Sequence, residues 1–420
     1  MAALVTLSQS AEPLTSHAQS ADPAYVYYFP LITNATREPL ASTSYYLPTT
    51  DPTFLYNLGC EHGRRDLLLP GTQDSVIVLD FSYPVLDPVF GFGAALFEDN
   101  PYEHPTDPAS IDQITDGVKG FAQGYYNCSG ADTQSNLVIG VGTNNKPNSI
   151  DTPQKAEAHG ATWGQMVSMI NNWAVNLGIF HQVQTYGASD MEVSWNTPEW
   201  TRAWIKGFES AGSNLLIHFG DAAGCPYEDN PHWSCGPYWT VEDVWYIAWG
   251  APSAIPLPLI YLTNGVHAKQ WASLSQYSLS QHGYRMDFSG VFTQYYYCQQ
   301  FKDKPWSTCE GYLDNTPEEA HAQLTKELNK NPGTAQTIRW KTDIRWIHED
   351  EVNRKTTTVT DSGFTSHPVY DEIAKLQFAL ETPTLSPLLK SSLETKLKIY
   401  ETLALMIETS KQHPATKNLP

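Results

Sequence analysis

Apolar runs and amphipathic stretches alternate along the middle of the chain. Residues 76–81 and 137–141 are almost continuously apolar, as strands buried on both faces are. Residues 109–124 and 158–177 carry apolar side chains at helical spacing, and Ser110 is placed to cap the first of these helices. The pattern predicts a strand followed by a helix, and then the same unit again.

This unit recurs about six times at intervals of roughly 35–55 residues, which is typical of an α/β fold. The further predicted strands are 180–185, 214–219, 258–263 and 288–297, and the further helices are 199–210, 240–249 and 267–282. No Gly-x-Gly-x-x-Gly follows the first strand, so a dinucleotide-binding fold is not supported. We predict a TIM-like (β/α) barrel over residues 74–310, either closed or incomplete and flattened.

The chain before the predicted barrel has a different character. Residues 1–24 are rich in Ser, Ala and Thr and predict a mobile segment. Residues 25–73 predict an irregular covering segment that begins with a short apolar strand at 25–32. The first residues show no clear signal peptide, and one hypothesis is that the true start lies upstream and that this sequence begins inside a leader.

The chain after the predicted barrel suggests a smaller extension. Residues 311–360 predict a helix opened by a capping box at Thr316, followed by a strand at 338–346 in which apolar and charged residues alternate. Residues 355–359 would pair with that strand. Residues 361–420 predict a helical hairpin.

Composition narrows the range of partners. The 420 residues include 25 Lys and Arg against 45 Asp and Glu, a net charge of -20, and such a surface repels nucleic acid and anionic lipid. Aromatic residues make up 12% of the chain, which fits either stacking on sugar rings or a large aromatic core. No stretch reaches the ~20 apolar residues needed to span a bilayer. The oligomeric state is left open.

The six cysteines favour an oxidising compartment. Their spacing predicts two local loops and one longer bridge, although six cysteines allow fifteen pairings. The predicted pairs are Cys225 with Cys235, Cys298 with Cys309, and Cys60 with Cys128. We therefore expect a secreted or cell-surface protein.

Two acids two positions apart provide the first sign of chemistry. Asp190 and Glu192 follow a predicted strand, and alternate residues of an extended chain share a face, with Cα atoms about 7 Å apart. Glycoside hydrolysis uses paired carboxylates separated by ~5 to 9.5 Å. Tyr186 and Trp195 flank the pair as aromatic contacts for a sugar. The alternative is an ordinary strand end with two solvated acids.

A barrel would bring other polar residues to the same place, because barrel active sites form at the carboxyl ends of the strands. The residues expected at this edge, besides the pair, are Asp80, Asn144, Asp221, Tyr261, Asn264 and Gln294. Glu192 is predicted to be the general acid, and Asp190 to orient the substrate or stabilise charge. Asp80 and Asp221 are candidates for a nucleophile or base. Alternatively, Asp80 caps a helix and Asp221 belongs to a cysteine-bounded loop.

Other chemistries lack their motifs. There is no Gly-x-Ser-x-Gly, no His-Glu-x-x-His and no phosphate-binding loop. His218, Asp221 and His232 make a poor set of metal ligands, because the neighbours of His218 on its strand face the opposite way. We predict neither a metal site nor a cofactor.

The sequence Leu79-Asp80-Phe-Ser82, followed by Asp190-Met-Glu192, resembles the family 25 glycoside hydrolases, the Chalaropsis-type lysozymes. That family has an Asp-x-Ser on its first strand, an Asp-x-Glu on a middle strand and a flattened (β/α) barrel. The resemblance implies cleavage of peptidoglycan by a retaining mechanism, with Glu192 as the acid and Asp190 beside it.

Two functions are therefore carried forward. The first is an exported glycoside hydrolase that acts on a polysaccharide or peptidoglycan by carboxylate acid/base catalysis. The second is a non-catalytic glycan-binding or surface protein on the same scaffold, since a fold does not fix a function. Ion pairs from Asp190 and Glu192 to Arg or Lys would favour a structural role for the two acids.

Overall fold

A computed structural model describes residues 40–352, with gaps at 70, 99–107, 131, 133, 147, 233, 305–308 and 310–312, together with Glu394, Leu397 and Lys398. The predictions for 1–24, 25–32 and 355–359, and for the helical hairpin at 361–420 apart from those three positions, lie outside the described residues. Within the described part, no helix combines the length and apolarity needed to cross a bilayer.

Eight parallel strands form one sheet in which neighbours in space are neighbours along the chain. The strands are β1 (Ser42–Tyr46), β2 (Ser75–Asp80), β6 (Leu137–Asn144), β7 (Val183–Asp190), β8 (Leu216–His218), β9 (Ala254–Pro256), β10 (Gly290–Thr293) and β11 (Trp340–Trp346). Their order is β10-β11-β1-β2-β6-β7-β8-β9. The last strand, β11, pairs with the first, β1, so the two ends of the barrel sequence meet.

The sheet closes almost completely between β9 and β10. Leu259, just beyond β9, forms a parallel bridge with Phe292 of β10, and the Phe292 N–H donates to the Pro258 carbonyl at 2.9 Å. Pro256 and Pro258 lack N–H groups, so the predicted strand at 258–263 makes a bridge rather than a full ladder. The prediction of a TIM-like barrel is confirmed.

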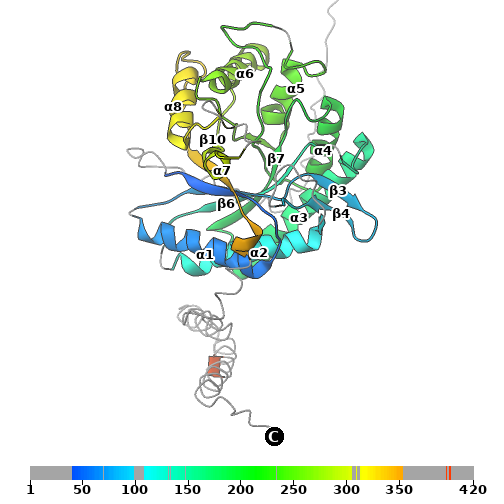
Figure 1. Ribbon diagram of the computed structural model, residues 1–420, viewed down its shortest axis with the longest axis vertical. Helices are drawn as coiled ribbons and strands as arrows, with labels where there is room; N and C mark the ends of the chain where they lie inside the picture. The colour runs from blue at the N-terminus through cyan, green and yellow to red at the C-terminus, as the bar shows by residue number, and fades with distance from the viewer. Residues whose placement is uncertain are drawn as a thin grey trace, which may run out of the picture. The chain divides into compact units, whose positions relative to one another are not determined.

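Helices follow the strands and pack in neighbouring pairs, α1 with α2, α3 with α4, and α6 with α8 (Figure 1). The helices are α1 (Pro52–Leu68), α2 (Ile111–Cys128), α3 (Pro153–Leu177), α4 (Pro198–Ser210), α5 (Val241–Trp245), the π-helix η1 (Tyr246–Gly250), α6 (Val266–His282), α7 (Tyr295–Phe301) and α8 (Pro317–Leu328). Ser110 caps α2 and a capping box at Thr316 opens α8, as predicted, and the cap at Ser110 is also a capping box. A small antiparallel sheet of β3 (Pro84–Asp87), β4 (Gly91–Ala95) and β5 (Pro108–Ser110) is inserted between β2 and α2.

The prediction of irregular structure over residues 25–73 is wrong for β1 and α1. The sequence did not predict strand β1, because its inward-facing residues Ser42 and Ser44 carry hydroxyl groups rather than apolar side chains. The Ser44 hydroxyl lies 2.7 Å from the Thr342 hydroxyl and accepts the Val78 N–H at 2.8 Å. These hydrogen bonds allow polar residues to line the barrel interior.

The prediction for β11 is also wrong in one respect. We expected this strand to belong to an extension after residue 310, and in the structure it is the eighth strand of the barrel. Its charged residues face the surrounding helices, where Lys341 lies 3.6 Å from Glu318 and Arg345 pairs with Glu351 at 2.8 Å. Asp343 accepts the N–H groups of Tyr295 and Tyr296 at 2.7 and 2.8 Å, which starts α7. The predicted strand at 288–297 therefore stops at Thr293.

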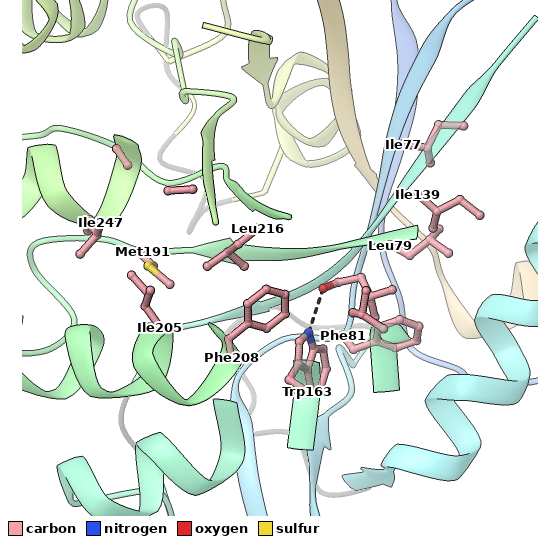
Figure 2. Packing of buried hydrophobic residues seen from close by; sticks show 14 of the residues in the cluster. Ile77, Leu79, Phe81, Ile139, Trp163, Met191, Ile205, Phe208, Leu216 and Ile247 are labelled. Atoms are coloured by element: carbon pink, nitrogen blue, oxygen red, sulfur yellow. Dashed lines mark hydrogen bonds between the residues drawn. The ribbon is translucent and has the colours of Figure 1, made fainter. Parts of the chain in front are cut away.

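The core between the sheet and helices α3 and α4 fixes the direction of the acidic motif. Trp163 of α3 is fully buried and donates its indole N–H to the Val141 carbonyl at 3.0 Å (Figure 2). Met191 lies in the same core, near Ile205 of α4, and is 1% exposed. Since successive residues of an extended chain face opposite ways, burying Met191 on the helix side turns Asp190 toward the inside of the barrel.

Candidate active site

Four carboxylic acids gather at the carboxyl ends of three barrel strands. Asp80 ends β2 and Asp190 ends β7, while Glu192 lies two residues beyond β7 and Asp221 three beyond β8. Parallel strands of a barrel end at the same edge. The acids influence one another there, because burial, followed by the charges of Glu192, Asp80 and Asp221, raises the pKa of Asp190 well above its usual range.

Asp190 and Asp80 are the most deeply placed of the four. Asp190 is 6% exposed, and its Oδ1 atom is buried without a hydrogen-bond partner among the described residues. Asp80 is 1% exposed, and burial raises its pKa to about 7 although its Oδ1 accepts the Ser82 N–H at 2.9 Å. Ser82 makes this contact with a positive φ of 67°, a conformation that costs energy for any residue with a Cβ.

Glu192 has the properties of a proton donor. Burial, together with the charge of Asp221, raises its pKa to about 8. The Ser194 hydroxyl, which donates to Glu192 Oε2 at 3.4 Å, and the charge of Lys146 oppose this rise. At neutral pH the Glu192 carboxyl therefore keeps its proton in the free protein.

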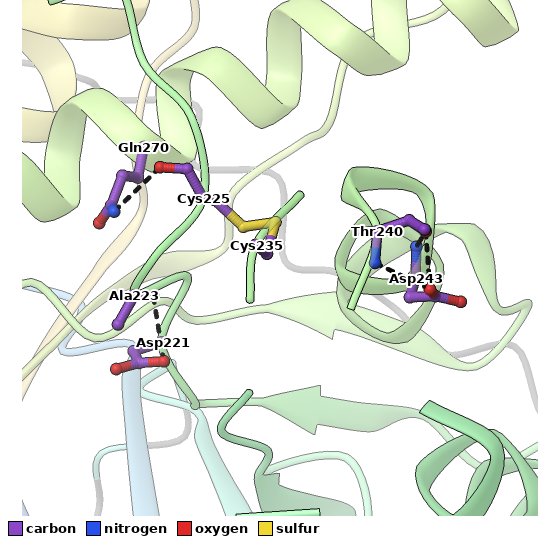
Figure 3. The surroundings of a disulfide bond; sticks show 7 residues. All are labelled: Asp221, Ala223, Cys225, Cys235, Thr240, Asp243 and Gln270. Carbon is purple, nitrogen blue, oxygen red and sulfur yellow. Dashed lines mark hydrogen bonds between the residues drawn. A yellow bond between two sulfur atoms is a disulfide. The ribbon is translucent and has the colours of Figure 1, made fainter. Parts of the chain in front are cut away.

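Asp221 begins a loop that a disulfide bond holds in place (Figure 3). Its Oδ1 accepts the Ala223 N–H at 3.2 Å, and burial raises its pKa to about 6. Cys225 pairs with Cys235, and Gln270 of α6 donates to the Cys225 carbonyl at 3.1 Å. The disulfide closes the loop that carries Asp221, and the Gln270 contact joins that loop to α6.

All three predicted disulfides are present, and none of the six cysteines is free. Disulfide bonds of this kind are typical of extracellular proteins.

None of the four acids forms an ion pair with a lysine or arginine of the described residues. The condition that would have indicated a structural role for Asp190 and Glu192 is therefore not met there. In the same part of the chain, no three His, Cys, Asp or Glu side chains are arranged to hold a metal ion.

Two buried tyrosines lie near the acids. The sequence analysis named Tyr261 and missed Tyr46. Tyr46, the last residue of β1, has its pKa raised by burial and then by the charges of Asp190 and Asp80. Tyr261, a predicted contact, has its pKa raised by burial and by the same group of acids and tyrosines. The ring of Tyr46 lies 5.4 Å from Trp346, the last residue of β11. The one available signal for Tyr46 and Trp346 was that each ends a strand.

Two further residues that we predicted to contact the substrate lie beside the acidic pair in the sheet or in the sequence. Asn144 pairs with Asp190 across the β6–β7 ladder and accepts the Lys146 N–H at 3.0 Å. Trp195 lies in the turn after Glu192 and is partly exposed.

Of the other three predicted contacts, one lies deeper in the barrel and two lie at the starts of helices. Tyr186 is 1% exposed and faces the barrel interior about 14 Å before Asp190, where its hydroxyl donates to Gln184 at 3.2 Å. Asn264 is exposed and accepts the Val266 N–H at the start of α6. Gln294 immediately precedes α7.

Comparisons with known proteins give little further information. No family model matches the chain, and no curated protein matches it. Among solved structures, it is similar to a xylanase–α-amylase inhibitor protein determined in complex with trehalose, at 13% sequence identity over 77% of this chain and 99% of that one, with a TM-score of 0.31. At that TM-score the similarity does not establish a common fold, and the barrel is established by the strand order instead.

Proposed function

We propose that this protein is a glycoside hydrolase that uses carboxyl groups at the carboxyl end of its barrel as acid and base. The observation that supports this most is the pair of Asp190 and Glu192. They are neighbouring carboxyls with raised pKa values, buried at the strand ends and free of ion pairs with described cations. Glycosidases keep one carboxyl protonated beside an ionised one, and the pKa values of about 8 for Glu192 and about 6 for Asp221 are separated in this sense.

In this proposal Glu192 protonates the leaving oxygen of the glycosidic bond, since its pKa of about 8 keeps the proton in place at neutral pH. Asp221, with a pKa of about 6, is ionised at the same pH and supplies negative charge to a cationic transition state. Asp80 and Asp190 lie deeper and orient the substrate or, once ionised, assist as nucleophile or base. Tyr46 and Tyr261 would contact the sugar.

The substrate class follows from the resemblance to family 25 and is therefore a proposal. The structure alters one part of that resemblance, because Asp80 ends the second barrel strand instead of the first. The Asp-x-Glu ends the fourth strand, in the middle of the barrel as the family pattern requires. We propose peptidoglycan as the first substrate to test, followed by other polysaccharides, and a secreted or cell-surface location consistent with the three disulfides.

The test is turnover of a panel of glycans by the purified chain and by Glu192→Gln. We expect the variant to lose ~10² to 10⁴ in kcat while it keeps its fold and its glycan affinity, because Gln cannot donate a proton to the leaving oxygen. Glu199→Gln, which alters an exposed glutamate in the first turn of α4, is the matched control. Unchanged kcat in Glu192→Gln would remove this residue from the mechanism.

A second variant tests the electrostatics. Asp221 is the charge that raises the pKa of Glu192 after burial, so Asp221→Asn should move the basic limb of the pH profile of kcat/KM to lower pH. Binding without turnover by the wild-type chain, across the whole panel, would favour the non-catalytic glycan-binding alternative.

A further inference from the structure

The ladder between β6 and β7 ends at the pair Asn144 and Asp190, and Asp190 lies two residues before the proposed acid, Glu192. Beyond this pair, the side chain of Asn145 makes the hydrogen bonds to Glu192 that a neighbouring strand would make within the sheet. The amide of Asn145 accepts the Glu192 N–H through Oδ1 and donates to the Glu192 carbonyl through Nδ2, both at 3.1 Å. One asparagine therefore satisfies both backbone groups of the residue that carries the acid.

Asn145 is itself held from several sides. It is fully buried, its N–H donates to the Asp190 carbonyl at 3.2 Å, and its carbonyl accepts the Asn196 side chain at 3.0 Å. Its Nδ2 also donates to the Thr201 hydroxyl on α4 at 3.2 Å. The position of Glu192 is thus tied to β6, to the turn after β7 and to α4 through one side chain.

We infer that Asn145 is a positioning residue for the Glu192 carboxyl group: by clamping the Glu192 backbone, it holds that carboxyl in its buried place beside Asp221. The inference deepens the proposed function and rests on it for the catalytic consequence. The placement of Glu192 can be measured whether or not the protein is an enzyme. A backbone shift of about 1 Å at a catalytic group can cost ~10² in rate.

The charged and titratable groups around Glu192 come from five parts of the barrel, and each of them can affect the pKa of Glu192. They are Lys146 after β6, Asp190 on β7, Asp221 after β8, Tyr46 on β1 and Tyr261 after β9, with Asp80 of β2 acting on Asp190. Asn145 carries no charge. Its removal therefore changes the titration of Glu192 only by moving the carboxyl or admitting water.

A second asparagine, which binds the backbone of the same strand β7, provides a matched control. Asn171 of α3 makes the same pair of bonds to Thr185 of β7, where Oδ1 accepts the Thr185 N–H at 2.9 Å and Nδ2 donates to its carbonyl at 2.7 Å. Asn171 is also buried, at 6% exposure. Asn171→Ala therefore removes an equivalent clamp from the same strand, five residues before Asp190.

The experiment follows the Glu192 carboxyl directly, by carbon-13 NMR of protein labelled at the glutamate side-chain carboxyl, with Glu192→Gln to assign the signal. In Asn145→Ala we expect the titration midpoint of Glu192 to fall by about one pH unit or more toward its ordinary value, because a loosened carboxyl reaches water. In Asn171→Ala the midpoint should stay where it is in the wild type. On a substrate that the wild type cleaves, Asn145→Ala should lose ~10² in kcat with little change in KM, and Asn171→Ala should keep its kcat.

The outcomes separate the two proposals. A Glu192 midpoint that is unchanged in Asn145→Ala, or that shifts equally in both variants, overturns the positioning role. Absence of turnover in the wild type counts against the proposed hydrolase, while the NMR comparison still decides the role of Asn145. If Asn145→Ala does not fold, Thr201→Val takes its place. It removes the hydroxyl that accepts from the Asn145 amide, together with that hydroxyl's own bond to the Thr197 carbonyl at the start of α4. The midpoint should then move in the same direction by a smaller amount, and an unchanged midpoint overturns the inference.

Discussion

Replacing Asp80 by asparagine should make the protein more stable at neutral and alkaline pH, although it removes a residue of the candidate active site. The Asp80 carboxyl is almost completely buried, and its pKa is raised to about 7 from the ordinary 3.8. Asparagine has nearly the same shape, and its Oδ1 can still accept the Ser82 N–H that Asp80 accepts at 2.9 Å. The substitution therefore removes the ionisation and keeps the local structure.

The magnitude follows from linkage between protonation and folding. Below pH 3.8 both the folded and the unfolded chain hold this proton, and Asp80 makes no pH-dependent contribution. Between pH 3.8 and about 7 the unfolded chain ionises while the folded protein keeps the proton, so the free energy of unfolding falls by ~1.4 kcal/mol for each pH unit. Above about pH 7 both states are ionised and the loss stops, at about 4 kcal/mol.

The assay is denaturant unfolding of the wild type and of Asp80→Asn between pH 4 and pH 9, followed by the fluorescence of the 13 tryptophans. The gain in the variant should be near zero at pH 4, grow through pH 5 and 6, and level off above about pH 7 at about 4 kcal/mol. Asp116→Asn, which alters a side chain with 67% exposure on α2, is the control without burial. A difference between wild type and Asp80→Asn that does not change with pH would refute the argument.

Three other predictions concern stability. Replacing Cys60 and Cys128 by serine should cost about 4 kcal/mol of unfolding free energy, because their disulfide closes a loop with a sequence separation of 68; an unchanged melting temperature in the absence of reductant would contradict this. Ser82→Gly should be about 1 kcal/mol more stable than Ser82→Ala in denaturant unfolding, since only glycine adopts the positive φ without strain, and equal stabilities would count against strain at this position. Trp163→Phe should lower the unfolding free energy by about 2 kcal/mol, because it leaves a cavity and removes the indole hydrogen bond to the Val141 carbonyl; a loss below about 0.5 kcal/mol in the same assay would show that neither matters.

Much of the barrel could be predicted from the sequence because its central strands are buried on both faces. Residues 76–81 and 137–141 are apolar for that reason, and the structure places β2 and β6 there, with β6 extended to Asn144. The first and last strands do not follow this rule. Ser42 and Ser44 of β1 line the barrel interior with hydroxyls. The charged residues of β11, which are Lys341, Asp343 and Arg345, bind polar partners in the segments that surround the sheet. Their hydrogen bonds are tertiary contacts, which no local pattern of hydrophobicity records.

The acids of the candidate site could also be predicted from the sequence, whereas the residue that positions Glu192 could not. Asp80, Asp190 and Asp221 could be found because each follows a recognisable strand, and strand ends of a barrel converge whatever the sequence between them. Asn144 was named as a contact and its neighbour Asn145 was not, although Asn145 makes the two bonds to the Glu192 backbone. Adjacent residues at a strand end face opposite ways, and which of two asparagines reaches the next strand depends on where the ladder stops. The ladder stops at Asn144 and Asp190, a point that is known only once the two strands are in register.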